Sequence, residues 1–356
     1  MDTITHALSG ALLARATEPE APRPDQLPRR ARMWVGFLAA AFPDGDFALL
    51  FLNPLTYLTT HRGLTHSIVL LPLWAALLAL TFMLLMRRKY PWRAFVGVCA
   101  LGIGIHIAGD VITAFGTMIF APLSDWRAQL PTTFIIDPYF TAIIVAGLIA
   151  SANWKMPCVP AVIGVAVLAV YVGFQGTLYN RAAAAGRAYV LEHGLKDAQV
   201  EAVPQPFSPF HWMVVVIEPG GYRLSYISLV RRRIPAPPAA DAYWFQRIFA
   251  AYRPSRDADW SKVPRFGPAA GAAVAADAWG SRALAPYRRF ALLPAVYRVD
   301  RRSAQLCVWF QDLRFALPGR TPPFRYGACR DAADAAWRVH RLIVLDDGRE
   351  IPDPVQ

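Results

Sequence analysis

Histidine, aspartate and arginine side chains recur in the otherwise apolar first half of the chain. These residues are His6, Asp44, Asp46, His61, Arg62, His66, His106, Asp110, Asp125 and Asp137. An ionisable side chain at membrane depth costs roughly 2.5–3.5 kcal/mol on insertion scales, so a cluster of them needs compensation. A shared divalent metal ion supplies that compensation, because carboxylates and neutral imidazoles are preferred ligands of such ions. The residue types therefore predict a metal site in an apolar setting.

The spacing of these residues favours the same interpretation. His106 and Asp110 are four apart, so on a helix both side chains leave one face about one turn apart. Asp44 and Asp46 lie on a turn broken by proline and glycine, whose free carbonyls also suit a site. Two histidines flank a glycine in the run His61-Arg62-Gly63-Leu64-Thr65-His66-Ser67. The backbone can bend at the glycine and direct both imidazole rings toward one site.

Each of these residues also has a purely structural interpretation. A histidine near the start of a helix, such as His6, is commonly interfacial, and Arg62 could extend to lipid headgroups. Asp44 and Asp46 could cap or terminate a helix, and two histidines in a loop could lie at the membrane surface. Together these interpretations require several coincidences at one membrane depth. The metal site is the simpler explanation.

The composition divides the chain into two halves. Residues 1–179 hold 12 Lys or Arg and 9 Asp or Glu, whereas residues 180–356 hold 25 and 16. With 55% hydrophobic residues, the whole chain is apolar for a soluble protein and polar for one that lies entirely in a membrane. We therefore predict an α-helical polytopic membrane bundle over residues 1–179, followed by a soluble α+β domain over residues 180–356.

Apolar stretches predict about five spans after a short N-terminal helix over residues 1–16. The spans cover residues 33–52, 67–86, 94–120, 134–150 and 157–179. The second of them carries no charge, and a helix of its length extends ~30 Å, the thickness of a bilayer's hydrocarbon core.

The basic residues of the short loops predict the orientation of this bundle. Residues 17–32 and 87–93 carry four Lys or Arg each, whereas residues 53–66 and 121–133 carry one each. Because basic loops stay in the cytoplasm, the histidine-rich run and everything after residue 179 should lie on the opposite side. The second half would then be periplasmic or extracellular.

The second half shows signals of sheet structure and no catalytic motif. Residues 212–217 and 222–230 predict a hairpin around a Pro-Gly-Gly turn, and residues 306–315 and 341–345 predict further strands. An alanine-rich stretch over residues 180–196 predicts a helix. Cys307 and Cys329 could pair if this half is extracytoplasmic. The net charge of +12 suits an anionic membrane surface, and no nucleic-acid motif accompanies it, so we expect no nucleic-acid partner.

Four motifs of the first half resemble those of one known family. They are Asp2-x-x-x-His6, Pro43-Asp44-x-Asp46, His61-Arg62-Gly63-x-Thr65-His66-Ser67 and His106-x-x-x-Asp110. In combination they resemble the YdjM/YbcI family of inner-membrane proteins, which are described as membrane-bound metal-dependent hydrolases. The resemblance covers roughly residues 1–150. It implies a hydrolase of the bacterial inner membrane that depends on zinc.

By motif position, the resemblance also implies a ligand set. The implied ligands are His6, Asp46, His61 or His66, His106 and Asp110, with Asp110 bridging where two ions bind. The order of these residues is also similar to that in zinc-dependent phospholipase C, an all-helical enzyme with a multi-zinc site. The later His and Glu ligands of that enzyme have no evident match after Asp110.

The expected chemistry is metal-assisted hydrolysis of a phosphoester. One or two Zn²⁺ ions would lower the pKa of a bound water toward ~7. Arg62 could neutralise a phosphate, Thr65 or Ser67 could orient it, and Asp44 could act as general base or orient a ligand imidazole. A site at the bilayer surface would meet membrane lipid, so a lipid or lipid-linked phosphate is the expected substrate.

Two other classes of function remain open from the sequence. A non-catalytic membrane protein could keep a structural metal site while its outer domain binds a partner. A transporter could use intramembrane His and Asp to move metal ions or protons. The transporter is the weaker alternative, because Asp137, near one end, is the only His, Asp or Glu of residues 134–179.

Overall fold

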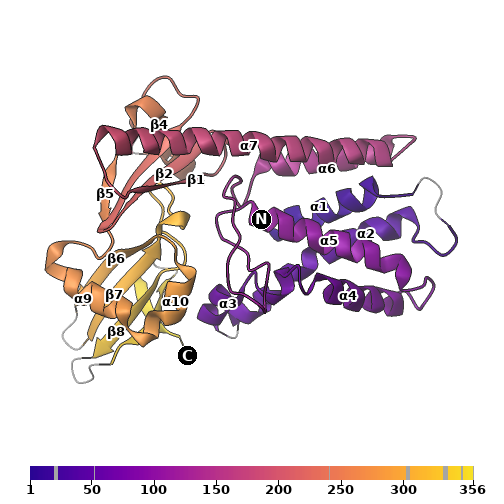
Figure 1. Cartoon of the computed structure of the whole chain (residues 1–356), viewed down its shortest axis with the longest axis horizontal. Coiled ribbons are helices and arrows are strands. Elements are labelled where there is room, and N and C mark those ends of the chain that lie inside the picture. The colour runs from indigo at the N-terminus through magenta and orange to yellow at the C-terminus, as the bar shows by residue number, and fades with distance from the viewer. Residues whose placement is uncertain are drawn as a thin grey trace. The chain divides into compact units, whose positions relative to one another are not determined.

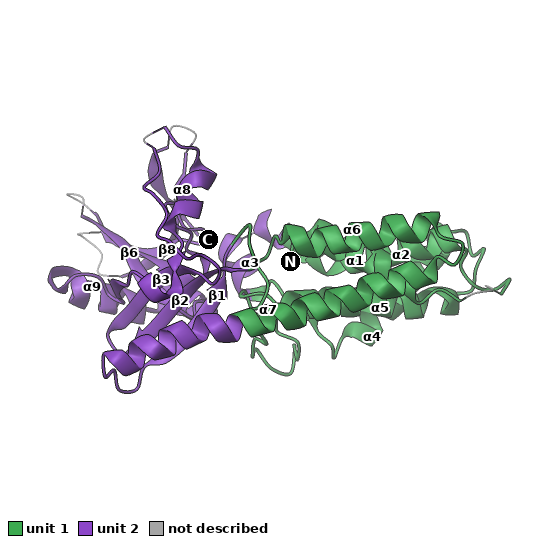
Figure 2. Ribbon diagram, turned by 90° about the horizontal axis from the view of Figure 1, so that it is seen from above, with its two compact units in different colours: residues 1–48, 60–178, 206–209 green, residues 49–59, 179–205, 210–356 purple. Residues whose placement is uncertain are grey.

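The computed structural model describes the chain as two compact units. The described residues are 1–19, 23–51, 53–239, 241–301, 305–331, 336–345 and 348–355. Unit 1 comprises residues 1–48, 60–178 and 206–209, and unit 2 comprises residues 49–59, 179–205 and 210–356 (Figure 2).

Unit 1 is built from helices (Figure 1). They are α1 (Thr3–Ala16), α2 (Arg29–Ala41), the start of the 3₁₀ segment η1 (Phe42–Phe51), the 3₁₀ turn η2 (Leu64–His66), α4 (Leu71–Leu85), α5 (Arg93–Val111), α6 (Pro138–Asn153) and the first part of α7 (Cys158–Glu192). Asp2 begins α1 by accepting a hydrogen bond from the Thr5 backbone N–H at 3.0 Å. The change from α2 to η1 occurs at Phe42, directly before the proline of the predicted break.

Three helical segments of the described chain are long and apolar enough to cross a membrane. They are Arg29–Phe51, Arg93–Val111 and Cys158–Glu192. A fourth span results if Pro54–His66 and Leu71–Leu85, which meet at a bend of 81°, count as one. The helical N-terminal region with three to four candidate spans agrees with the predicted membrane bundle, whereas the count of about five stays a prediction.

Three element boundaries differ from the sequence prediction. Residues 53–60 form helix α3 (Pro54–Thr60) instead of a loop, because the Asn53 side chain caps its first turn. Helix α5 ends at Val111, well before residue 120. The two helices predicted over residues 157–179 and 180–196 are one continuous helix, α7, because its alanine-rich second half contains no proline. Leu52, the last residue of a predicted span, lies outside the described residues.

Glycines bring three helices of unit 1 into close backbone contact. A Cβ placed on Gly10 of α1 would lie 2.2 Å from the carbonyl oxygen of Gly36 of α2. A Cβ on Gly102 of α5 would lie 2.8 Å from Cβ of Ala39 and 3.0 Å from the Gly36 carbonyl oxygen. Small residues permit this approach, which is how helices commonly associate in membranes. His6 and His106 lie four residues from Gly10 and Gly102, so the same contacts position both rings.

Unit 2 contains two five-stranded sheets. The first has the order β1 (Gln199–Pro204), β2 (His211–Glu218), β3 (Gly221–Ser228) and β4 (Arg253–Pro254), with β5 (Ser261–Pro264) also paired to β3. The second has the order β10 (Glu350–Pro354), β9 (Arg338–Val344), β8 (Tyr326–Asp331), β7 (Gln305–Asp312) and β6 (Pro294–Arg301). Helices α8 (Trp244–Ala251), α9 (Ala269–Gly280) and α10 (Ala285–Phe290) belong to the same unit. The predicted hairpin is confirmed, because β2 and β3 pair antiparallel from His211 with Ser228 to Glu218 with Gly221.

The second sheet is held by side chains as well as by its strands. Cys307 and Cys329 face each other across β7 and β8 and form a disulfide. Glu350 on the edge strand β10 pairs with Arg298 on the opposite edge strand β6 and with Arg325. Partial burial raises the pKa of Glu350, but the hydrogen bonds and charges of the two arginines outweigh it and hold the pKa below its ordinary value.

Candidate metal centre

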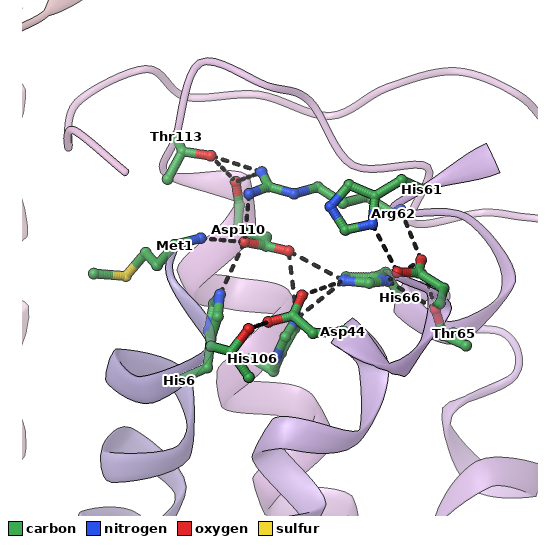
Figure 3. Close-up of polar contacts among 12 residues, drawn as sticks. Met1, His6, Asp44, His61, Arg62, Thr65, His66, His106, Asp110 and Thr113 are labelled. Atoms are coloured by element: carbon green, nitrogen blue, oxygen red, sulfur yellow. Dashed lines mark hydrogen bonds and ion pairs between the residues drawn. The ribbon is translucent and has the colours of Figure 1, made fainter. Parts of the chain in front are cut away.

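A fully buried carboxylate lies at the centre of the site (Figure 3). Asp110 belongs to the last turn of α5 and has none of its surface exposed. Its Oδ1 pairs with the amine of Met1, lies 3.0 Å from His6 Nε2 and lies 2.9 Å from a guanidinium nitrogen of Arg62. A buried charge needs such partners, so these groups stabilise the ionised carboxylate.

The second oxygen of Asp110 has a different environment. Oδ2 is buried and has no hydrogen-bond partner among the described residues. It lies 3.2 Å from His66 Nε2 and 3.4 Å from His106 Nε2, and these two nitrogens are 3.0 Å apart. One carboxylate oxygen and two imidazole nitrogens therefore converge on one point.

The other ring nitrogens determine which tautomers these histidines adopt. His106 Nδ1 lies 2.6 Å from the carbonyl oxygen of Ala40, which can only accept, so Nδ1 carries the proton. The Thr65 hydroxyl donates to Asp46 Oδ2 at 3.3 Å and accepts from His66 Nδ1 at 2.9 Å. In the neutral rings both Nε2 atoms then keep their lone pairs. Two lone pairs that face each other at 3.0 Å favour a cation between them.

Asp44 completes a group of four possible ligand atoms. Its Oδ1 lies 3.7 Å from His66 Nε2 and 3.5 Å from His106 Nε2, and the four atoms, including one from Asp110, lie within 4.8 Å of one another. Tetrahedral ligands of Zn²⁺ at 2.0–2.1 Å lie about 3.3–3.4 Å apart. The five separations that involve an imidazole nitrogen, from 3.0 to 3.7 Å, are close to that value, so these residues could hold a divalent metal ion.

A shell of hydrogen bonds around Asp46 supports this group. Asp46 Oδ1 lies 2.7 Å from His61 Nδ1. Its Oδ2 accepts from the Arg62 backbone N–H at 3.2 Å and from the Thr65 hydroxyl. Asp46 therefore fixes the backbone at Arg62 and, through Thr65, the tautomer of His66. Partners of this kind orient metal ligands in known sites.

Arg62 is bound within the site rather than directed at its surface. Its backbone adopts a φ of 61°, and its side chain is 2% exposed. The guanidinium donates to the Thr113 hydroxyl at 2.7 Å and lies 4.7 Å from the centre of the Phe115 ring, besides its contact with Asp110. A phosphate contact by Arg62 would have to compete with these interactions.

A known protein family matches the helical half of the chain. The family of YdjM inner membrane proteins matches residues 1–182, just over half of the chain. The chain belongs to the YdjM family. Its YdjM region, residues 1–182, contains all the residues of the site.

One curated relative of the chain is an uncharacterized protein by its own name. The chain is 28% identical over 178 residues to the uncharacterized protein YfhP of Bacillus subtilis (strain 168). The match covers 49% of this chain and 52% of that protein, so the chain spans about half the length of this relative. No solved structure matches the chain. The likeness to zinc-dependent phospholipase C therefore gains no support here.

The predicted site residues of the YdjM region fall into two groups in the structure, the possible ligands and the residues that surround them. His66, His106, Asp110 and Asp44 form the four-atom group. His6, Asp46, His61, Arg62 and Thr65 surround it. His6 stacks on His106 with ring centres 3.7 Å apart, so it contacts the group without belonging to it.

Other predicted and unpredicted residues have supporting roles. Asp137 caps α6 and accepts hydrogen bonds from Tyr171 and Gln175, as expected for a structural carboxylate. The Ala40 carbonyl and Thr113 are part of the surroundings of the site that the sequence motifs do not predict. A carbonyl carries no signal in the sequence, whereas Thr113 follows Asp110 by three residues and donates to its carbonyl oxygen at 2.8 Å.

Replacing His106 by Ala should remove most of the metal affinity. The substitution deletes one ligand atom of four, so zinc affinity should fall by more than the ~10–100-fold that loss of a supporting partner costs. Inductively coupled plasma mass spectrometry of the purified full chain, after dialysis against a weak chelator, measures the bound zinc. His193→Ala is the matched control, because His193 is exposed directly after α7 and its ring contacts the Tyr189 carbonyl oxygen, far along the chain from the ligands. Equal zinc in both variants would contradict the site.

Replacing Asp46 by Asn should weaken the site without removing a ligand. Asparagine has no charge, and it replaces one acceptor oxygen by an amide nitrogen, which donates. The hydrogen bonds to His61 and Thr65 cannot then both be kept, so the tautomer of His66 is no longer fixed and zinc affinity should fall ~10–100-fold. Competition against a fluorescent zinc chelator measures this change. Asp125→Asn, an identical substitution at an exposed loop residue, should leave the affinity unchanged. An unchanged affinity in Asp46→Asn would assign Asp46 no supporting role.

Proposed function

We propose that the YdjM region is a membrane-bound metal-dependent hydrolase. The observation that carries this proposal is the convergence of Asp44, His66, His106 and Asp110, with both imidazole lone pairs facing inward. Two imidazoles and two carboxylates suit Zn²⁺. When bound, such an ion activates water for attack on an ester and polarises the oxygen that is attacked.

Different residues of the site would bind the ion and orient its ligands. Arg62 and the Met1 amine offset the charge on Oδ1 of Asp110, which leaves Oδ2 for the ion. Asp44 is the most accessible ligand, with 13% of its side chain exposed, whereas His66 and His106 have none. A substrate would therefore approach from the side of Asp44. Thr3 orients this carboxylate by donating to its Oδ2 at 2.6 Å.

The loop bonded to the site favours a lipid-like phosphoester as substrate. Met118 donates to the Arg62 carbonyl oxygen at 2.8 Å, and the Arg127 guanidinium donates to the His61 carbonyl oxygen at 3.3 Å. The same loop exposes 79% of Leu123 and 57% of Trp126. Exposed aromatic and apolar side chains are typical of the membrane–water interface, where phosphoester headgroups lie.

A structural metal site is the second candidate. Four protein ligands and near-complete burial resemble closed structural zinc sites, whereas catalytic sites keep one position for water or substrate. In that case the ion would stabilise the fold, and unit 2 would bind a partner. The two candidates predict different effects of replacing Asp44. Turnover falls if the site is catalytic, whereas no turnover exists to be lost if the ion is structural.

Hydrolysis by the zinc-loaded full chain distinguishes the two candidates. We expect turnover of bis(p-nitrophenyl) phosphate or a short-chain phospholipid that stops with a chelator and returns with zinc. Asp44→Asn should keep zinc at saturating concentration on its three remaining ligands but lose roughly 100-fold or more in turnover. Asp125→Asn should retain full turnover. Absence of turnover in the wild type, with a chelator lowering only the melting temperature, would favour the structural candidate.

We also propose that the chain is a multi-pass protein of the bacterial inner membrane with residues 180–356 in the periplasm. The basic loops at residues 17–32 and 87–93 support this orientation. The disulfide between Cys307 and Cys329 supports it independently, because disulfides persist in oxidising compartments.

Fusions to alkaline phosphatase, which is active only outside the cytoplasm, test this orientation. A fusion after residue 356 should be active. A fusion after Lys155, between α6 and α7, should be inactive, because an odd number of spans separates the two positions in the proposed topology. The reverse pattern would place the second unit in the cytoplasm.

A further inference from the structure

A cavity lies at the other end of the helices that build the candidate metal centre. It has a volume of about 690 Å³, and its lining includes Arg32 of α2 and Trp92, Arg93 and Gly97 at the start of α5. Helix α5 runs from Arg93 to Val111, so at 1.5 Å per residue Arg93 and Asp110 lie about 25 Å apart along the axis. The cavity and the metal centre therefore belong to opposite ends of unit 1, at a separation close to the thickness of a bilayer.

Two arginines line this cavity, Arg32 and Arg93. Arg32 also donates to the carbonyl oxygens of Ala14 and Thr17 at 3.0 Å each, so Arg93 is the main candidate for contact with a ligand. Further basic residues lie close to these two in the sequence: Arg23, Arg29, Arg30, Arg87, Arg88 and Lys89, of which Arg29 pairs with Glu18. One acidic residue, Asp25, also lines the cavity. The N-terminus of α5 adds the positive end of a helix dipole. These charges favour an anionic ligand.

Two of these arginines occupy backbone positions that disfavour side chains. Arg87 and Arg88 have φ values of 52° and 57°, in the left-handed region. This conformation is unfavourable for a residue with a Cβ, and glycine would adopt it without strain. The α4–α5 turn keeps two arginines there nonetheless, which is consistent with a use for their charge.

The walls of the cavity are apolar below its charged rim. Val98 and Leu101 continue the lining along α5. Trp92 is 44% exposed, as aromatic residues at a membrane interface commonly are. A Cβ built on Gly97 meets nothing within 4 Å, so this glycine leaves space open to the cavity. A polar rim above an apolar wall suits an amphipathic ligand.

We propose that this cavity binds an anionic glycerophospholipid, with its phosphate near Arg93 and Arg32 and its acyl chains along the apolar wall of α5. Basic pockets between spanning helices on the cytoplasmic side commonly bind anionic headgroups. The volume lies within the range of ligand cavities. The bound lipid is not the substrate of the metal centre, because α5 separates the two sites by most of its length. The proposal is independent of whether that centre is catalytic.

Native mass spectrometry of the full chain, titrated in detergent with phosphatidylglycerol, tests this binding. Arg93→Gln removes a rim charge and Gly97→Leu fills the open space, so each should lower phosphatidylglycerol affinity about tenfold. Arg181→Gln and Gly173→Leu are the matched controls. Arg181 is exposed on α7, and a Cβ on Gly173 meets nothing within 4 Å, so neither control should change the affinity. Unchanged melting temperatures would show that all four variants fold.

Several results would overturn the proposal. Unchanged affinity in Arg93→Gln and Gly97→Leu would remove the cavity as the binding site, and an equal loss in the two controls would indicate non-specific binding. Equally tight phosphatidylcholine binding would remove the role of the anionic headgroup. If soluble glycerol 3-phosphate binds as tightly as the lipid, the ligand is a soluble phosphate ester and the lipid proposal is wrong.

Discussion

The close contact of α1, α2 and α5 through glycine is the constraint on which the metal centre depends. In a membrane, helices gain little from burying apolar surface against one another, so association relies on tight packing and hydrogen bonds. Gly10, Gly36 and Gly102 permit backbone contact that any larger residue would prevent. Four residues along α1 and α5 from these glycines, His6 and His106 stack at 3.7 Å. A looser bundle would separate the rings, and with them the ligand atoms. The glycines are therefore part of the site, although they carry no functional group.

The charges around Asp110 determine where a cation could bind in this packed interior. Asp110 is completely buried, and its two oxygens face two kinds of positive charge. Oδ1 faces fixed protein cations, including Arg62, while Oδ2 faces imidazoles whose tautomers leave lone pairs toward it. With neutral imidazoles, Asp44 and Asp110 are the anionic members of the four-atom group, and Arg62 and the Met1 amine offset part of the charge of Asp110. A metal ion bound at this group would offset the remaining negative charge, so its binding would also stabilise the bundle.

The residue types of the site were predictable from the sequence, but their roles were not. Charged groups are so costly in apolar segments that those present, such as His106 and Asp110, stand out against their surroundings. Whether a residue can hold an ion or orients another ligand depends on which ring nitrogen it faces. Asp44 lies 3.7 Å from Nε2 of His66 and Asp46 lies 3.7 Å from its Nδ1, a distinction that sequence spacing does not supply. The hairpin of unit 2 was predictable because its strands flank a Pro-Gly-Gly turn. The continuity of α7 was not, because an apolar and an alanine-rich stretch look like two helices until their backbone is seen to be unbroken.

Helix α5 links the two candidate sites by one physical property. Its N-terminus, which carries the positive end of the helix dipole, borders the basic cavity at Arg93, where an anion is favoured. Its C-terminal turn carries the negative end, and there the Asp110 carbonyl oxygen accepts a hydrogen bond from the Arg62 guanidinium at 3.3 Å. Cations are stabilised at that end of a helix, so the dipole adds to the attraction of the carboxylates for a metal ion. Arg93 and Asp110 have the same sign as the dipole at their own ends of α5, so each adds to the attraction for a ligand of the opposite charge.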